Sequence, residues 1–367
     1  MQIDFANLKI QHNLYKEEIE EAILKVARDC NFIMGSQIDK LERDLEKFTG
    51  SKYAISCSSG TDALLLAMMA LDIQPDDEII TTPFTFFATA ETIAFLKAKP
   101  VFVDIDEKTY NIDPSKIEEK ITPKTKAIIP VSLYGQPADM DEINQIAKKY
   151  NLKVIVDGAQ SFGSTYKGIS DSNLGDISCT SFFPAKPLGC YGDGGALFTN
   201  DEKLADKIKS LRLHGQSIRY HHQYIGMGGR LDTIQAAVLN VKLKYYEKDL
   251  KLRQDVAEKY TKALNAKNIE TPFVKNDRTS AWAQYSIRVQ NRTELQTKLQ
   301  NLGIPTAVHY PMPLHVQECF KYLNLKEGDF PISEKVSKEI MSLPMNPYVS
   351  DEEIEFIVEN LAKELRC

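Results

Sequence analysis

The sequence predicts an α/β protein whose large domain is built on a mostly parallel sheet. From about residue 50 to residue 200, short apolar segments alternate with longer helical patterns, as expected for an α/β layer. Each apolar segment is bounded by Pro, Gly, Asp or Asn, which favour turns. With 367 residues, 43% hydrophobic and 26% charged, the chain is long enough for one large domain and a smaller one.

The predicted elements can be placed along the chain in order. Apolar, β-branched runs predict buried parallel strands at residues 52–57, 77–82, 99–105, 126–133 and 152–158. Between them, crossover helices are expected at residues 61–71, 86–98 and 139–151. From about Asp232 a long helical pattern leads to a strand at residues 283–289, a helix near residues 295–302 and a terminal helix from Asp351. We therefore predict a large domain over residues 1–250 and a smaller C-terminal α/β domain over residues 251–367.

Composition and charge exclude several classes of protein. The net charge of -6 and the pI of about 5.7 leave no basic surface for nucleic acid. The longest apolar run, from Ala63 to Leu71, is far shorter than the roughly 20 residues that cross a bilayer. The start of the chain lacks the pattern of a secretory signal, which predicts a cytoplasmic protein. The six cysteines are scattered without a metal, redox or disulfide motif.

Four segments at predicted strand ends carry the residues that suggest chemistry. In the first, residues 58–64, Gly60 and Thr61 open a helix, where free backbone N–H groups and a hydroxyl can bind a phosphate. The same residue types also serve as ordinary helix caps. In the second, residues 83–90, three phenylalanines lie close together. One ring could stack on a flat heterocycle, or all three could belong to the core.

The third and fourth segments each carry a charged side chain in apolar surroundings. Asp157 ends the apolar run Val154-Ile155-Val156, where a carboxylate is costly unless it meets a cation or caps a helix. A protonated pyridine nitrogen is such a cation. Lys186 follows two phenylalanines and lies between two prolines near several glycines. Most lysines are solvated surface residues, but this rigid loop suits an amine that forms an imine with a carbonyl.

Taken together, these segments resemble the DegT-type sugar-nucleotide aminotransferases. The patterns S-G-T-x-A-L, D-x-A-Q and S-F-x-x-x-K-x-L-G-x-x-G-x-G-G occur in order from Ser59, Asp157 and Ser181, with PFTFFATA from Pro83 between the first two. The likeness covers nearly the whole chain. It implies the pyridoxal 5′-phosphate (PLP) fold-type I, aspartate-aminotransferase-like, with no metal site.

The resemblance also implies a role for each matching residue. Gly60, Thr61 and Ser181 would hold the cofactor phosphate. Phe87 would stack on the pyridine ring, and Gln160 would approach the ring hydroxyl. The two catalytic residues would be Asp157, which pairs with the ring nitrogen, and Lys186, which binds the cofactor covalently.

Members of this family act as homodimers in which each site is completed by a loop of the partner chain. The corresponding loop here is Gly226 to Arg230, and it departs from the family pattern G-x-N-x-R because Gly228 replaces the asparagine. This replacement removes the side chain that would reach the neighbouring phosphate. The resemblance further implies that His309 and Tyr310 lie at the sugar, although this segment could instead be a turn after a strand of the small domain. Arg230 could join them in binding a sugar carboxylate, and we expect His221 and His222 in a surface or interface loop.

Within the family the likeness is closest to enzymes that aminate UDP-2-acetamido-2-deoxy-3-oxo-glucuronic acid. The predicted reaction is PLP-dependent transfer of an amino group from glutamate to this keto-sugar nucleotide, in the biosynthesis of a surface polysaccharide such as lipopolysaccharide. The alternatives are a 4-keto- or 3-keto-6-deoxy sugar nucleotide as substrate, or a non-catalytic PLP-binding regulator. Lys186 argues against the related dehydratases, in which a histidine takes its place, and a nicotinamide enzyme would need a G-x-G-x-x-G turn.

Overall fold

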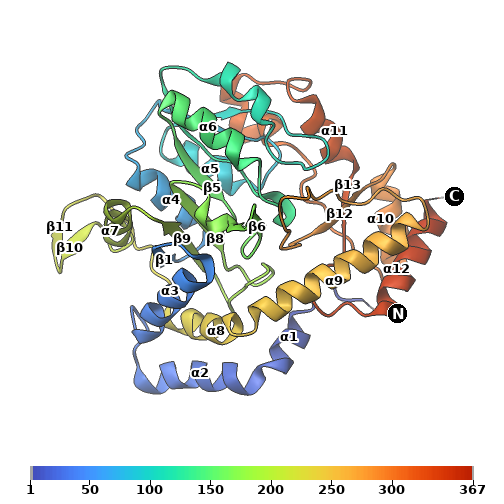
Figure 1. The fold of residues 1–367 in the computed structure, drawn as a ribbon, viewed down its shortest axis with the longest axis horizontal. Helices are drawn as coiled ribbons and strands as arrows, with labels where there is room; N and C mark the ends of the chain where they lie inside the picture. The colour runs from blue at the N-terminus through green and yellow to red at the C-terminus, as the bar shows by residue number, and fades with distance from the viewer. Residues whose placement is uncertain (1–2, 366–367) are drawn as a thin grey trace.

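A seven-stranded sheet forms the centre of the protein, which we describe from a computed structural model for residues 3–365 (Figure 1). The strand order is β1-β9-β8-β5-β4-β2-β3. Strand β9 runs antiparallel to both of its neighbours, and the remaining pairs are parallel. The strands are β1 (Tyr53–Cys57), β2 (Glu78–Thr81), β3 (Lys99–Phe102), β4 (Thr125–Ile128), β5 (Lys153–Asp157), β8 (Ile177–Ser181) and β9 (Gly195–Thr199). The predicted α/β class is confirmed.

Helices cover both faces of this sheet because alternate strand residues point to opposite sides. Ile55 and Ile155 pack against α4 and α7, whereas Ala54 packs with α3 and α8 and Val154 with α6. The helices of this part are α1 (Leu8–Leu14), α2 (Lys16–Asp29), α3 (Ser36–Thr49), α4 (Gly60–Ala70), α5 (Ala88–Phe95), α6 (Met140–Tyr150), α7 (Glu202–Leu211) and α8 (Thr233–Leu243). All five predicted strands and all three crossover helices are present, within three residues of their predicted bounds except that β4 ends five residues early. The strands β8 and β9 and the helix α7 were not predicted.

A second hydrophobic core lies in the C-terminal part of the chain. The helices and strands that build it lie together on one side of the protein (Figure 1). This core is built by the helices α9 (Tyr246–Asn265), α10 (Arg292–Asn301) and α12 (Asp351–Glu364) around the antiparallel pair β12 (Tyr285–Arg288) and β13 (Ile340–Leu343). Ile3, at the other end of the described chain, is also buried in this core. The single long helix expected after Asp232 is in fact two, because the chain breaks between α8 and α9, and the predicted domain boundary at residue 250 falls inside α9.

The remaining elements are short. They are α11 (Pro331–Glu339) and the hairpins β6 (Thr165–Tyr166) with β7 (Ile169–Ser170) and β10 (Gln216–Ile218) with β11 (His221–His222). The second hairpin projects from the body of the protein and carries the exposed His221 and His222 (Figure 1). In the part of the chain covered by the structure, no helix combines the length and apolar character needed to cross a membrane.

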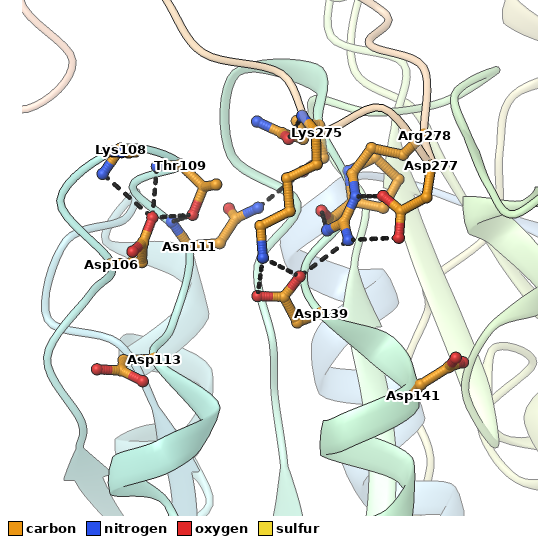
Figure 2. Close-up of polar contacts among 12 residues, drawn as sticks. Asp106, Lys108, Thr109, Asn111, Asp113, Asp139, Asp141, Lys275, Asp277 and Arg278 are labelled. Carbon is orange, nitrogen blue, oxygen red and sulfur yellow. Dashed lines mark hydrogen bonds and ion pairs between the residues drawn. The ribbon is translucent and has the colours of Figure 1, made fainter.

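Charged side chains attach the segment between α9 and β12 to the start of α6 (Figure 2). The amine of Lys275 lies 2.7 and 2.8 Å from the two carboxylate oxygens of Asp139, and the guanidinium of Arg278 lies 2.9 Å from one of them. Arg278 also pairs with Asp277 at 2.7 Å and donates to the carbonyl of Pro137. The Arg278 side chain is only 2% exposed. These partners therefore offset the free-energy cost of removing its charge from water.

Candidate active site

The sheet brings three of the predicted segments to the same edge. Gly195, the first residue of β9, pairs with Cys57 on one side and with Ser181 on the other, and Cys179 pairs with Asp157. Because β1, β5 and β8 all run towards this edge, the chain leaves each of them close to the same point. The start of α4, the Asp157 turn and the Lys186 loop are therefore neighbours, although they are far apart in the sequence.

The start of α4 forms a cradle that suits an anion. Ser59 caps the helix by accepting a hydrogen bond from the Asp62 N–H at 3.0 Å. The N–H groups of Gly60 and Thr61 make no hydrogen bond within residues 3–365 and remain available to a ligand. A Cβ at position 60 would lie 2.7 Å from the Cβ of Ser181, so only glycine allows Ser181 to come so close to the helix start. This arrangement fits a phosphate group.

Asp157 and Lys186 form a pair of opposite charges in a poorly solvated space. Asp157 is 6% exposed, and it accepts hydrogen bonds from the Thr89 hydroxyl at 2.7 Å and the Ala159 N–H at 3.2 Å. Burial raises the pKa of Asp157, although these hydrogen bonds and the charge of Lys186 oppose the increase. Burial lowers the pKa of Lys186, which the charge of Asp157 partly offsets. A lowered lysine pKa favours the neutral, nucleophilic amine.

The C-terminal part of the chain supplies His309 and Tyr310 to the same site. The amide of Gln160 donates to the Tyr310 hydroxyl at 3.0 Å, while its oxygen accepts from the Tyr134 N–H at 2.7 Å. Burial, together with the charge of Lys186, lowers the pKa of His309 to about 4. His309 is therefore neutral at pH 7 and can offer hydrogen bonds but no charge. Its Nδ1 lies 3.0 Å from the Ser342 hydroxyl.

Comparison with known proteins identifies the family. The model of the DegT/DnrJ/EryC1/StrS aminotransferase family matches residues 13–362, almost the whole chain. The chain belongs to this family. The predicted family is thus confirmed, and so is the prediction that the protein is an aminotransferase.

Individual relatives support this assignment, since each is similar to this chain over almost its whole length. The chain is 51% identical to the UDP-2-acetamido-2-deoxy-3-oxo-D-glucuronate aminotransferase of Pseudomonas aeruginosa, over 97% of this chain and 98% of that protein. Its structure is similar to a crystal structure of a DegT DnrJ EryC1 StrS aminotransferase from Brucella abortus, with a TM-score of 0.94, 38% identity and coverage of 99% and 100%. It also resembles the PLP-form of a putative sugar aminotransferase, Spr1654, from Streptococcus pneumoniae, with a TM-score of 0.89, 26% identity and coverage of 95% and 97%.

Phe87, the ring predicted to stack on the cofactor of this aminotransferase, is half-buried just before α5. The Phe87 ring packs against Phe320 with 5.6 Å between centroids, in a small apolar cluster. Phe86 is 54% exposed, and its ring centroid lies 5.9 Å from that of Tyr310. Both rings therefore contact the C-terminal part of the chain, and Phe87 stays the predicted stacking residue.

The loop from Gly226 to Arg230 lies beside the anion cradle of its own chain. The Ser58 N–H donates to the carbonyl of Gly229 at 3.1 Å. A Cβ at Gly228 would lie 3.1 Å from the His214 ring and 3.8 Å from the Arg230 guanidinium. The Nε of Arg230 is buried without a hydrogen-bond partner in the described residues, as are those of Arg212 and Arg253, and a ligand that is not part of this chain could bond to it.

Sequence analysis missed a second buried carboxyl group behind Asp157. Asp171 is 1% exposed and accepts hydrogen bonds from Ser132, at 2.9 Å, and from Ser161. A Cβ at Gly158 would lie 3.0 Å from its Oδ2, so Asp171 packs directly against the turn that follows Asp157. Asp171 begins a short helical turn after a hairpin, and no sequence pattern marked it.

Asp171 should make the stability of the protein depend on pH. Burial raises the pKa of Asp171 to about 6 from its usual value of 3.8, so the folded state favours the protonated form. The contribution of the protonated Asp171 to the free energy of unfolding is complete below pH 3.8 and is lost as the pH rises through 6. Asp171→Asn should therefore gain stability relative to the parent protein, on the order of 3 kcal/mol, as the pH rises across this window. Thermal unfolding between pH 4 and 8 measures this, and a constant difference in Tm would contradict it.

Proposed function

We propose that this chain transfers the amino group of glutamate to C3 of UDP-2-acetamido-2-deoxy-3-oxo-glucuronic acid. The observation that carries the proposal is the desolvated pair of Asp157 and Lys186 beside the anion cradle. It supplies an amine for the cofactor aldehyde, a carboxylate for the ring nitrogen and N–H donors for the phosphate. The 51% identical relative, named for this substrate, supports the choice of sugar. The product would enter surface-polysaccharide biosynthesis in the cytoplasm.

The cofactor is pyridoxal 5′-phosphate, as the sequence predicts, and the residues present fit it. When bound, it supplies a protonated pyridine ring that accepts the electron pair left when a C–H bond next to nitrogen is broken. Asp157 keeps the proton on the ring nitrogen by its opposite charge. Gly60, Thr61 and Ser181 would bind the phosphate. We assign the stacking ring to Phe87, which is half-buried and lies two residues before Thr89, the hydroxyl donor to Asp157.

Lys186 has two roles in this mechanism. Its amine would hold the cofactor through the aldehyde carbon. When glutamate takes that place, the freed amine of Lys186 would serve as the base for the α-proton of the donor and as the acid that returns a proton. The same steps run in reverse with the keto sugar. Burial lowers the pKa of Lys186, which favours the neutral amine that this role needs.

Arg230, His309 and Tyr310 are the residues we assign to the sugar. A uronic acid carries a carboxylate that needs a cationic or hydrogen-bonding partner. Arg230, with its unpaired Nε, supplies the charge, while the neutral His309 and Tyr310 supply hydrogen bonds. Gln160 already bonds to Tyr134 and Tyr310, so we assign it to the wall of the site beside the cofactor hydroxyl.

We further propose a homodimer with shared sites. The projecting hairpin and the loop after it expose apolar side chains, among them Ile218 at 71%, Tyr220 at 78% and Ile225 at 92%. Exposed apolar groups that project from a surface are typical of contacts with another chain. A second copy of this chain covers them, and a monomeric mass in sedimentation would argue against this arrangement.

The substrate is tested by coupling NAD-dependent oxidation of the UDP-sugar to this enzyme, with glutamate as the donor. We expect amination of the 3-keto uronic acid, and Arg230→Ala or His309→Ala should reduce kcat/KM for it by about 10- to 100-fold. Neither change should reduce kcat/KM for a 6-deoxy sugar as strongly. Arg28→Ala is the matched control, since this arginine is exposed on α2 and pairs only with Glu21 among the described residues. Turnover of a 4-keto-6-deoxy sugar nucleotide without turnover of the uronic acid would overturn the substrate and leave the transaminase intact.

A further inference from the structure

Tyr134 occupies a tightly packed turn in an apolar cluster that also contains Val131 and Ile340. It lies in the short helical turn Leu133–Gly135, is 8% exposed and has a φ of 58°. Its carbonyl accepts a hydrogen bond from the Ala283 N–H at 3.0 Å, and the next carbonyl, that of Gly135, accepts from the Ala281 N–H at 3.0 Å. A Cβ at Gly135 would lie 2.5 Å from the backbone nitrogen of Trp282. The backbone of Tyr134 is therefore fixed against the segment that leads into β12.

From this fixed position Tyr134 contacts both sides of the active site. Its N–H donates to the side-chain oxygen of Gln160 at 2.7 Å, and its hydroxyl donates to the carbonyl of His309. The Gln160 amide donates to the Tyr310 hydroxyl at 3.0 Å. Since His309 and Tyr310 are adjacent in the chain, these contacts form a closed ring of hydrogen bonds.

This ring joins the Asp157 turn to the segment that we assign to the sugar. Gln160 is 4% exposed and lies three residues after Asp157, whereas His309 and Tyr310 come from the C-terminal part of the chain. Loss of the Tyr134 hydroxyl would leave the His309 carbonyl without this donor. Buried polar groups are costly to leave unpaired, so the segment would adjust its position relative to the cofactor.

We propose that Tyr134 is a positioning residue that holds His309 and Tyr310 at the correct distance from the cofactor for the keto sugar. It does not touch the reacting atoms and acts through the His309 carbonyl and the Gln160 amide. This inference rests on the proposed function, because it needs the His309 segment to contact the sugar. It predicts that the Tyr134 hydroxyl matters more for binding of the sugar than for the reaction with glutamate.

The test is Tyr134→Phe, which removes only the hydroxyl. We expect KM for the keto-sugar nucleotide to rise about tenfold, while the rate of the half-reaction with glutamate, followed by cofactor absorbance, changes less than twofold. The UDP-sugar before oxidation has no keto group and does not react. Its Kd, measured by calorimetry, should rise by a similar factor. This second readout does not depend on turnover.

Tyr260→Phe is the matched control. The Tyr260 hydroxyl also donates to a buried carbonyl, that of Pro344 at 3.0 Å, but in the C-terminal core. We expect it to lower Tm without changing either KM. In addition, the effects of Tyr134→Phe and Tyr310→Phe on sugar binding should be non-additive, because both break the same ring.

Three outcomes would overturn the role of Tyr134: an unchanged sugar KM and Kd in folded Tyr134→Phe, equal effects on both half-reactions, or additive effects in the double variant. The assay uses whichever keto-sugar nucleotide the parent enzyme aminates. A different substrate would therefore disprove the proposed sugar while leaving the test of Tyr134 intact. Circular dichroism and Tm establish that the variant is folded.

Discussion

Lys186→Ala should reduce turnover by at least ~10⁴-fold, since it removes both the covalent attachment and the base that moves the proton. The variant should still bind the cofactor, because the anion cradle at Gly60 and Ser181 is unchanged. Its absorbance should be that of the free aldehyde form. Steady-state kinetics and an absorbance spectrum measure the two effects, and activity within tenfold of the parent enzyme would exclude this role for Lys186.

Borohydride reduction followed by peptide mapping provides the control for this assignment. Lys242 is a second buried lysine, 3% exposed, and burial lowers its pKa to about 8. Its amine already donates to the carbonyl of Gly189 at 2.7 Å and lies 4.8 Å from the centre of the Tyr191 ring. We therefore expect the reduced cofactor on Lys186 and none on Lys242. A label on Lys242 would mean that a lowered pKa, rather than position, selects the reactive amine.

Asp157→Asn should lower kcat by about 10²- to 10⁴-fold while the cofactor stays bound. The amide keeps the size of the side chain and can still bond to Thr89, but it no longer holds a proton on the ring nitrogen. Single-turnover kinetics with glutamate measure the loss directly. Near-normal kcat would refute the role of Asp157.

Asp171→Asn is the matched control for this change. It is the same substitution at a buried carboxyl group whose contacts are Ser132 and Ser161, so we expect kcat to change less than tenfold. If the two variants lost activity equally, the effect of Asp157→Asn would reflect distortion of the turn rather than loss of the charge opposite the ring nitrogen.

The central sheet could be predicted because its strands carry continuous apolar runs, as in β5, and its crossover helices lie between them. The helices before β1 were not predicted, although α3 has a clear apolar face with Ile38, Leu41 and Leu45 buried. The break between α8 and α9 was also missed. Both segments are rich in helix-forming residues, and where one helix ends is decided by packing against the sheet.

The candidate site also contains residues that could be predicted from the sequence and residues that could not. Asp157 and Lys186 could be recognised because burying a charged side chain in an apolar segment costs free energy. The roles of Tyr134 and Asp171 depend on contacts with residues distant in sequence, such as Tyr134 and His309, which are 175 residues apart. A single sequence contains no record of such contacts.

The position of Ile3 has a consequence for the order in which the chain folds during synthesis. All seven strands of the large sheet have been made by Thr199, and they can pair while the ribosome is still producing the rest. Ile3 instead packs with residues as late as Leu361 and donates its N–H to the carbonyl of Gly303 at 3.2 Å. Ile3 thus reaches its final place only after the C-terminal core has been made, and until then its apolar side chain stays in water.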